Sequence, residues 1–577
     1  MDGGRAGERG ALRKEPGGRL GVALVYPNAY RLGMANLGVH AVYRLVNDDP
    51  RVRCERVFLP EDGGEPRAVE SGRPLREFDV VAFSLSFEED HGNVLALLDG
   101  AGLPLRSADR DGRHPLVVAG GIAAQINPEP LAPFVDAFLV GEGEALVPTF
   151  LDLAHEAART GAPREEVLRA LAAFPGTYVP ALYDVAYSDT RAPGGEWVTR
   201  FESRHAPERV RRLWLPSLRG VATSRAVDSP DAEFGDLWLT EVARGCLWGC
   251  RFCAAGFVQR PYREVDLETL RAEARKGIAR GQRIGLVGPD TSDHSGLDAL
   301  TREIGEAGGT FSPSSLRVDA IDAALARRLA ASGERTVTLA PEAGTERLRR
   351  VVNKEFGDDR IVEAAEAALA EGLQSVKLYF MCGLPTETEE DVAGMARIAL
   401  RIREEVMLPW ARRRGVMGRI VLSVNPFVPK PWTPFQWAGM APRPALEAAR
   451  RLLERTLRPQ GIDVDFLSPR TAYVQALVSR GDRRVADLLE LAHREMGGDV
   501  GKALRRWPHD PGFFAEREAG TDERLPWDFL DHGVTKAHLA REWRRGREGK
   551  LTPPCAVETC RACGLDCADR PELRAGP

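Results

Sequence analysis

Residues 246–253 read Cys-Leu-Trp-Gly-Cys-Arg-Phe-Cys and bring three of the chain's nine cysteines within eight positions. An apolar run at residues 237–240 predicts a buried strand before them, and Gly245 and Gly249 loosen the turn between strand and cysteines. Thiolates spaced this closely on a loop can converge on one metal centre. Structural zinc, or an iron–sulfur cluster held only by protein, takes four ligands. Three thiolates on a four-iron cluster would therefore leave one iron open to a cofactor or substrate.

The Cys-x3-Cys-x2-Cys spacing, with Phe252 just before the last cysteine, resembles the loop of the radical S-adenosylmethionine (SAM) enzymes. The resemblance implies that Cys246, Cys250 and Cys253 hold a [4Fe-4S] cluster, whose fourth iron is chelated by the SAM amino and carboxylate groups. It also implies reductive cleavage of SAM to a 5′-deoxyadenosyl radical, with the electron supplied by a partner such as a flavodoxin or ferredoxin. The alternative is a group of buried or zinc-binding cysteines.

Length and composition indicate a globular protein of several domains. The chain has 577 residues, 43% of them hydrophobic and 28% charged. A net charge of −5 gives no general case for binding nucleic acid, and no apolar run reaches the ~20 residues that span a membrane. Seven of the nine cysteines lie in two tight clusters, which favours metal binding in a reducing compartment, the cytoplasm. Residues 1–20, rich in glycine and arginine, are expected to be a disordered leader.

Residues 21–155 alternate short apolar runs with helical stretches. The expected elements are a helix at 34–46 and buried strands at 22–26, 79–84, 115–121 and 137–140. Such alternation predicts an α/β domain with a parallel, doubly wound sheet, which binds ligands at the carboxyl ends of its strands. Four glycines follow the third and fourth strands, where the backbone is expected to approach something closely: Gly120, Gly121, Gly141 and Gly143.

These glycine turns resemble the cobalamin-binding-type Rossmann domain that precedes the radical domain in one large subgroup, which implies that the four glycines contact the cofactor. The Asp-x-His-x-x-Gly motif, whose histidine ligates cobalt in many cobalamin proteins, is absent, and His40 and His91 stand in other contexts. The alternative is a domain that only acts as a scaffold or binds substrate.

Residues 156–235 are expected to bridge two domains and to include a small β element. From 236 to 440 the α/β alternation returns, with expected strands at 237–240, 283–288, 315–318, 336–340, 375–380 and 420–424. This fits the partial (β/α)6 barrel that the resemblance implies, with the chemistry on loops at the carboxyl ends of the strands.

The resemblance assigns SAM contacts to three later blocks: Gly288, Pro289 and Asp290; Glu342, Arg347 and Lys354; Gly383, Leu384 and Pro385. The first stands where the family contacts the SAM amino group. In the second, a carboxylate suits the ribose hydroxyls and a cation suits the SAM carboxylate. The third stands beside the adenine. The alternative for each block is structural, because Gly-Leu-Pro can end a strand and charged residues can decorate a solvated helix start.

Residues 425–435 are dense in proline and aromatic side chains, so they are expected to form neither helix nor central strand. The segment resembles the exit loop of methylthiotransferase-like and cobalamin-type radical enzymes, where it faces substrate. A rigid loop that caps the open end of the barrel is the alternative.

Residues 441–577 are expected to be mostly helical and to end in a metal-binding tail. Its cysteines, Cys555, Cys560, Cys563 and Cys567, could ligate zinc or a second iron–sulfur cluster, or be free surface thiols. The region resembles the C-terminus of an uncharacterised radical SAM group that carries a cobalamin-like N-terminal domain. The basic run 541–550 fits an exposed helix face better than a nucleic-acid contact.

Together these patterns predict a radical SAM enzyme. If cobalamin binds, methylation of an sp³ carbon is the expected outcome; without it, rearrangement or RNA or protein modification stays open. A tRNA methylthiotransferase needs a second cluster on three N-terminal cysteines, whereas residues 1–235 contain only Cys54. The remaining alternative is a non-catalytic iron–sulfur or zinc-binding module. No membrane partner is expected, and the substrate is beyond the sequence.

Overall fold

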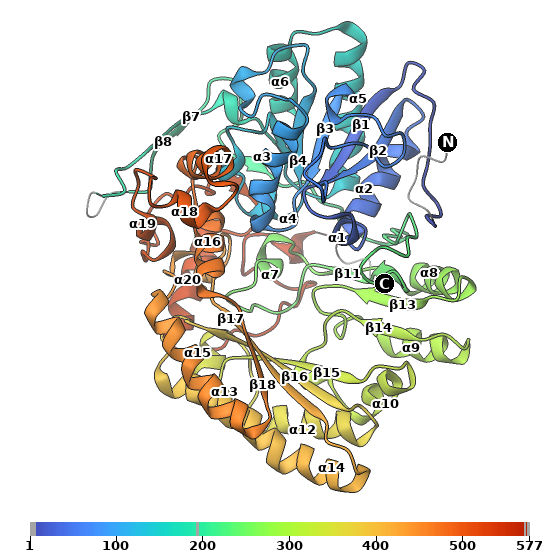
Figure 1. Cartoon of the computed structure of the whole chain (residues 1–577), viewed down its shortest axis with the longest axis vertical. Coiled ribbons are helices and arrows are strands. Elements are labelled where there is room, and N and C mark those ends of the chain that lie inside the picture. The colour runs from blue at the N-terminus through green and yellow to red at the C-terminus, as the bar shows by residue number, and fades with distance from the viewer. Residues whose placement is uncertain (1–6, 192–195, 571–572, 574–577) are drawn as a thin grey trace.

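The computed structural model describes residues 7–191, 196–570 and 573. Figure 1 places the N-terminal α/β domain at one end of the long axis and a second α/β domain at the other, with the C-terminal helices along one flank. The predicted α/β class is confirmed. In the described ranges no helix combines the length and apolar character needed to cross a membrane.

The N-terminal domain contains one six-stranded sheet in the order β2-β1-β3-β4-β5-β6, parallel except for β6. Its strands are β1 (Leu20–Tyr26), β2 (Val52–Phe58), β3 (Val80–Ser84), β4 (Leu116–Gly120), β5 (Ala137–Leu139) and β6 (Thr177–Tyr178). The strand order reverses direction between β1 and β3, which makes the carboxyl ends of these two strands the switch point where doubly wound sheets bind ligands. The predicted parallel sheet is present, with β2 as an additional strand.

Helices cover both faces of this sheet, because alternate residues of each strand bury on opposite sides. Val22 and Leu24 pack with α2 (Leu37–Asp48) and α5 (Gly143–Thr160), whereas Ala23 and Val25 pack with α3 (His91–Gly100) and α4 (Ile122–Ile126). The short α1 (Tyr30–Gly33) precedes α2, and α6 (Arg164–Ala173) follows α5.

The prediction of a disordered leader is wrong for residues 7–19, while residues 1–6 lie outside the described ranges. Lys14 Nζ donates to the carbonyls of Asp49 and Val52 at 2.7 and 2.9 Å. Glu8 forms a buried ion pair with Arg56 at 2.9 Å. These contacts fix the segment against α2 and β2, although its glycine-rich composition carries no sign of them.

The bridge contains the small β element that was predicted. An antiparallel hairpin pairs β7 (Asp184–Tyr187) with β8 (Val198–Glu202), and β9 (Val210–Arg211) pairs with β19 (Leu530–Asp531) from the far end of the chain.

The second domain contains seven parallel strands in two sheets, ordered β10-β13-β14 and β15-β16-β17-β18. The strands are β10 (Leu237–Glu241), β13 (Arg283–Val287), β14 (Phe311–Pro313), β15 (Thr336–Glu342), β16 (Ser375–Cys382), β17 (Arg419–Pro426) and β18 (Asp463–Phe466). Three expectations were wrong in detail. The barrel was expected to end at residue 440, but β18 extends its second sheet beyond that point. The strand expected at 315–318 lies earlier, at β14, and the proline-rich segment does begin in a strand, because Asn425 and Pro426 end β17.

Helices follow the strands and lie outside them (Figure 1). They are α8 (Leu267–Ala279), α9 (Leu297–Glu306), α10 (Ala323–Ala331), α11 (Glu346–Val351), α12 (Asp358–Ala370), α13 (Glu389–Arg401), α14 (Leu408–Arg414) and α15 (Arg443–Leu457). Between β10 and α8, the chain forms β11 (Ala243–Arg244), α7 (Ala255–Val258) and β12 (Arg263–Glu264).

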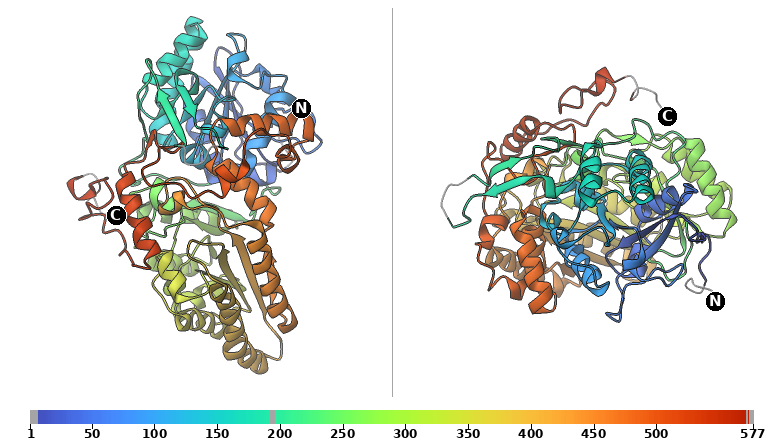
Figure 2. Two further views of the ribbon diagram at one scale, coloured as in Figure 1. Left: turned by 90° about the vertical axis from the view of Figure 1, so that its left-hand side faces the viewer. Right: turned by 90° about the horizontal axis from the view of Figure 1, so that it is seen from above.

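The C-terminal helices connect the two domains. They are α16 (Pro469–Arg480), α17 (Arg484–Met496), α18 (Val500–Ala503), α19 (Pro511–Ala515) and α20 (Lys536–Arg547). Helix α17 packs on α3, and α20 packs on α11. Figure 2 shows α20 and the tail on one side of the molecule, at the level where the two domains meet.

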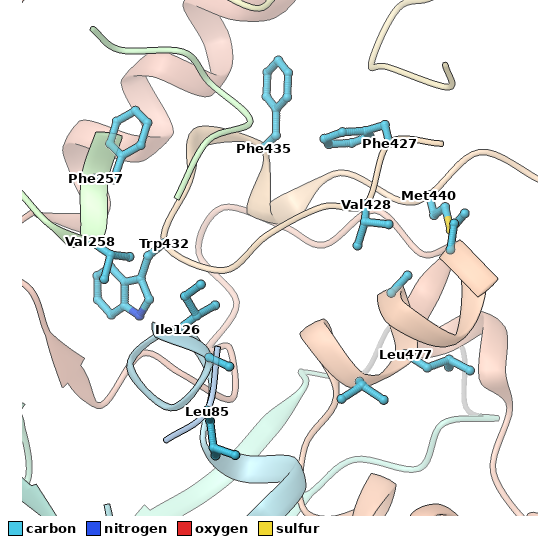
Figure 3. Packing of buried hydrophobic residues seen from close by; sticks show 14 of the residues in the cluster. Leu85, Ile126, Phe257, Val258, Phe427, Val428, Trp432, Phe435, Met440 and Leu477 are labelled. Carbon is cyan, nitrogen blue, oxygen red and sulfur yellow. The ribbon is translucent and has the colours of Figure 1, made fainter. Parts of the chain in front are cut away.

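One hydrophobic cluster runs through the junction. Figure 3 shows Leu85 and Ile126 of the N-terminal domain, Phe257 of α7, Trp432 beyond β17 and Leu477 of α16 around a common interior. Because all five side chains are buried, the domains share a core at this point and their relative position is fixed by packing.

Candidate functional site

The cysteine loop lies at the carboxyl end of β10, between β11 and α7. Gly245 begins the loop with φ +74°, and an added Cβ would lie 2.6 Å from the Pro261 carbonyl oxygen, so only glycine fits there. The Cys253 N–H donates to the Cys250 carbonyl at 3.1 Å and closes the turn. Three thiols are thereby placed on one tight, irregular loop at the end of a barrel strand, as the sequence predicted.

One side of the cysteine loop, its rear, packs against the end of α11 and the two residues that follow it. The Arg251 N–H donates to the Val352 carbonyl at 3.2 Å, and the Arg251 guanidinium donates to the carbonyls of Arg350 and Val351 at 3.0 Å each. Asn353 Nδ2 donates to the Gly249 carbonyl at 3.2 Å. Arg251 is fully buried, and sequence reasoning missed its role because an arginine between two metal ligands reads as solvent-facing.

The front of the loop is held by a tryptophan that the sequence did not single out. Trp248 Nε1 donates to Asp293 at 2.7 Å, and the Arg317 guanidinium carbon lies 3.4 Å from the Trp248 ring centroid. Burial raises the pKa of Asp293 to about 6 and also raises the pKa of Asp290. Asp290, a predicted SAM contact at the end of β13, is buried and accepts from the Ser292 N–H at 3.0 Å.

The donor set fits a [4Fe-4S] cluster with one iron free of protein ligands. Burial raises the pKa of the Cys246 thiol to about 12 and that of Cys250 to about 11, so both are protonated at neutral pH until a cluster binds and releases the protons. Lys354 opposes the effect at Cys250 by its positive charge. A cation close to the cysteines suits a thiolate-bound cluster, whose net charge is negative.

The second predicted SAM block divides into two parts. Lys354 Nζ donates to Glu342 Oε1 at 3.1 Å and to the Ala340 carbonyl at 2.6 Å, and both Lys354 and Glu342 act electrostatically on Cys250 and Cys253. Arg347 instead pairs with the buried Asp391 and donates to the Thr386 carbonyl at 2.9 Å. The structure therefore places Glu342 and Lys354 at the cysteine loop. The side chain of Arg347, which belongs to α11, is instead bound to Asp391 of α13.

Backbone strain concentrates at this end of the barrel. Four non-glycine residues there have positive φ: Glu342 at +69°, Asn353 at +67°, Thr386 at +65° and Trp432 at +61°. Each such conformation costs about 1–3 kcal/mol and persists where the surroundings determine it, most often at functional sites. Glu342, Thr386 and Trp432 end or follow β15, β16 and β17, so this strain lies at the edge where the sequence predicts the chemistry.

The third predicted block lies at the end of β16. Gly383 has φ +86°, and an added Cβ would lie 2.7 Å from Ala441 Cβ, so a glycine is required. Its N–H donates to Glu387 at 2.7 Å, and burial raises the pKa of Glu387 to about 7. Leu384 is buried and Pro385 is partly exposed beside it.

A cavity of about 280 Å³ lies between the N-terminal sheet and helices α2 and α5. Its walls are mostly apolar, and all four predicted glycines line it. The resemblance implied that all four glycines contact the cofactor, but two of them are required for another reason. An added Cβ at Gly121 would lie 2.4 Å from the Leu85 carbonyl oxygen, and one at Gly141 2.1 Å from that of Leu213, so both glycines accommodate the protein's own backbone.

At Gly120 and Gly143 an added Cβ would meet nothing closer than 3.6 Å. These two glycines therefore leave room in the cavity rather than being required by neighbouring backbone.

The same cavity extends to the barrel. Arg244, two residues before Cys246, lines it together with Glu241, at the end of β10, and Glu142. Arg244 pairs with Glu142 at 3.1 Å, with Glu144 at 2.6 Å and with Glu241 at 2.8 Å. A partly buried network of ion pairs thus joins the glycine turn after β5 to the entry of the cysteine loop.

The loop after β17 packs inward. Phe427, Trp432 and Phe435 are buried, and Lys430 Nζ forms an ion pair with Glu88 of the N-terminal domain at 2.6 Å. Glu88 also accepts from Ser479 Oγ of α16 at 3.1 Å. The loop therefore closes the junction between the two domains and α16, an arrangement not foreseen from the sequence because its partners are about 340 to 390 residues away from Glu88.

His40 and His91 of the N-terminal domain serve packing. His40 Nε2 lies 2.9 Å from the Met34 carbonyl, and its Nδ1 accepts from the Ala226 N–H at 3.2 Å. His91 is buried beside the Glu88–Lys430 pair. Neither lines the cavity.

Across the described ranges, no three His, Cys, Asp or Glu side chains are grouped so as to hold a single metal ion. The four tail cysteines are free thiols, and their use as ligands remains a prediction.

Comparison with known proteins identifies two regions. Residues 38–180 match the family model described as radical SAM proteins, N-terminal, and residues 240–399 match that of the radical SAM superfamily. Together the matches cover more than half of the chain. The uncharacterized protein MJ0966 of Methanocaldococcus jannaschii is 26% identical over 476 residues, which is 81% of this chain and 90% of that protein.

Among solved structures, the radical SAM methyltransferase TsrM from Kitasatospora setae, with cobalamin and a [4Fe-4S] cluster bound, is similar with a TM-score of 0.47 and 16% identity, over 74% of this chain and 80% of that one. The cobalamin-dependent radical enzyme OxsB, with aqua-cobalamin and SAM bound, gives a TM-score of 0.44 and 11% identity, over 92% and 79%. The two family matches coincide with the N-terminal sheet and with the barrel that carries the cysteine loop, and the chain is a radical SAM enzyme, a member of the radical SAM superfamily.

Proposed function

We propose that this enzyme binds cobalamin in its N-terminal domain and transfers a methyl group to an unactivated carbon. The observation that carries the proposal is the mostly apolar cavity at the carboxyl ends of β3, β4 and β5, which continues to Arg244 beside the cysteine loop. Doubly wound sheets bind cofactors at this edge. The position supports a cofactor that must meet SAM chemistry at the loop.

The lining suits part of such a group, because at about 280 Å³ the cavity is smaller than a whole cobalamin. Gly120 and Gly143 leave the cavity open, and its walls from α2, α5 and the sheet are apolar. No histidine lines the cavity, so the protein offers no imidazole ligand for cobalt there. Cobalamin bound here would be held by contacts to its ring and side chains, without a protein ligand to the metal.

When bound, the iron–sulfur cluster with SAM supplies one-electron bond cleavage, and cobalamin supplies methyl transfer. The chain's own residues position and enclose these groups. Cys246, Cys250 and Cys253 provide the thiolates, and Lys354 places a positive charge near them. Glu88 and Lys430 join the loops that close the junction, which restricts water around the reacting groups.

A low-potential one-electron donor of the flavodoxin or ferredoxin class is the partner we infer, since cluster reduction requires one. We infer a reducing, cytoplasmic setting from the nine free cysteines. The methylthiotransferase alternative gains no support, because Cys54 is fully buried in β2 and its backbone is paired to Asn47.

The proposal is tested by cobalt retention. Wild type is reconstituted anaerobically with iron and sulfide, supplied with hydroxocobalamin, desalted and analysed for cobalt. Gly143→Leu fills part of the cavity, so it should retain far less cobalt. Gly112→Leu is the matched control, because Gly112 is an exposed glycine of the same domain with no atom within 4 Å of an added Cβ. Wild type that retains no cobalt, or Gly143→Leu that retains as much as Gly112→Leu, would contradict the assignment of this cavity.

A further inference from the structure

The four cysteines of the tail lie against the rear of the cysteine loop. The Cys555 N–H donates to the Leu247 carbonyl at 2.7 Å, and Leu247 follows Cys246 directly. A backbone hydrogen bond spans about 5 Å between Cα atoms and one residue adds about 3.8 Å, so the Cα atoms of Cys555 and Cys246 lie within about 9 Å. Two groups of cysteines from opposite parts of the sequence are thus neighbours.

The tail is fixed at this position by polar contacts to the loop's support. The Thr552 N–H donates to Asn353 Oδ1 at 2.7 Å, and Asn353 also donates to the Gly249 carbonyl. Arg251 donates to the Lys550 carbonyl at 2.7 Å and to the buried Glu542 of α20 at 3.1 Å. The same two side chains, Arg251 and Asn353, therefore hold both the cysteine loop and the tail.

The cysteines themselves are placed by backbone hydrogen bonds. The Cys563 carbonyl accepts from the Thr535 N–H at 2.8 Å, and the Cys560 carbonyl accepts from the Ala568 N–H at 3.2 Å. Cys563 and Cys567 are each 2% exposed. Cys555 and Cys560 line the same cavity, and the bond from Ala568, which follows Cys567, places Cys567 next to Cys560. Four thiols thus share one small region.

A cavity of about 430 Å³ opens between the tail and the loop. Cys555 and Cys560 line it from the tail, and Gly249 lines it from the loop. Its polar walls are mainly cationic, from Arg260, Arg541, Arg545 and Arg561, with Glu542 as the acidic member. These cations lie beside Cys555 and Cys560, where positive charge stabilises thiolates and an anionic centre bound to them.

We propose that Cys555, Cys560, Cys563 and Cys567 together bind a second iron–sulfur cluster, and that this cluster holds the rear of the Cys246–Cys253 loop in place. Residues 551–570 contain one turn of regular structure, Cys567–Asp569, and few buried apolar side chains. Such a short segment lacks a core of its own, and metal binding can supply the missing folding free energy. This inference does not depend on cobalamin.

The first experiment removes the loop ligands and leaves the tail intact. The triple variant Cys246→Ser, Cys250→Ser, Cys253→Ser is reconstituted anaerobically with iron and sulfide, with zinc available in a parallel sample, and its metal content is measured. We expect about four irons with sulfide per chain, which identifies a cluster. A triple variant that binds about one zinc in place of iron, or neither metal, overturns the proposal.

The second experiment tests the coupling to the loop. Hydrogen exchange is measured in wild type and in Cys560→Ser, Cys563→Ser, with Thr559→Ser as the control, because Thr559 is an exposed residue of the same segment. We expect peptides that cover residues 246–253 to exchange at least tenfold faster in the double variant alone, while peptides that cover β1 stay unchanged and confirm that the chain is folded. Unchanged exchange at residues 246–253 overturns the supporting role, and faster exchange at β1 as well would show general unfolding and also count against it.

Discussion

Replacement of Arg251 by methionine should release the tail from the barrel. The guanidinium is fully buried and donates to the carbonyls of Arg350, Val351 and Lys550 and to Glu542, whose side chain is 5% exposed. Methionine keeps most of the volume but removes the nearer cation of the buried Glu542 carboxylate, which keeps only a longer ion pair with Arg545 at 3.7 Å. Breaking a buried ion pair in this way costs about 3–5 kcal/mol.

The effect is local, so hydrogen exchange is the appropriate assay. A loss of about 3 kcal/mol in the free energy of local opening corresponds to roughly 150-fold faster exchange. We expect that change at the amides of Thr552 and Cys555, which bond Asn353 and Leu247. The control is Arg547→Met on the same helix as Glu542, because Arg547 and its partner Glu518 are both more than half exposed and such pairs contribute about 0–1 kcal/mol. Exchange within about threefold of wild type at both amides of Arg251→Met would refute the structural role.

Further predictions concern SAM and pH. Lys354→Met should raise the dissociation constant of SAM at least about tenfold, because a charge-assisted contact contributes about 1.5–3 kcal/mol. Arg347→Met should change this constant little, since Asp391 holds the guanidinium. Equilibrium binding of labelled SAM to the reconstituted enzyme tests both variants, and equal effects would contradict the distinction. Glu387 has a folded pKa of about 7, above its ordinary 4.5, so its contribution to stability is fully present below about pH 4.5 and is lost as the pH rises through 7. Glu387→Gln should therefore raise the thermal transition temperature relative to wild type more at pH 8 than at pH 5, and a pH-independent difference would rule this out. Glu88→Gln weakens the pair with Lys430 and should increase protease sensitivity of residues 425–435 with no loss of loop iron, whereas lost iron would point to a wider collapse.

The sequence predicts those parts of the fold that local pattern specifies. The apolar runs of β1, β3, β4 and β5 and of β10, β13, β15, β16 and β17 were recognisable because each is bounded by turn residues, whereas β14 was misplaced and β18 was not expected. Strand β2 was missed since Arg53, Glu55 and Arg56 interrupt its apolar pattern, yet all three are buried. Ion pairs within the fold, Arg53 with Glu55 at 3.1 Å and Arg56 with Glu70 at 2.6 Å, make that burial possible, and no local pattern reveals them.

The candidate site shows the same division. The cysteine spacing was legible because the ligands lie within one loop. The contributions of Arg251, Glu88 and Lys430 could not be predicted from the sequence, because each depends on partners about 100 or more residues away. Gly121 and Gly141 were rightly expected at points of close approach, but what approaches them is the backbone of Leu85 and of Leu213. A sequence position can indicate that space is limited without indicating what occupies the space.

The most direct measurement is electron paramagnetic resonance of the enzyme loaded with cob(II)alamin and reduced to the paramagnetic state of the loop cluster. The N-terminal cavity ends at Arg244, two residues before Cys246, so the two centres should be close enough to couple magnetically. We expect a spectrum split by spin–spin interaction that is lost in the triple variant of Cys246, Cys250 and Cys253. Protein-bound cob(II)alamin and cluster signals that simply add, or the absence of bound cobalamin, would contradict the placement of the two cofactors side by side.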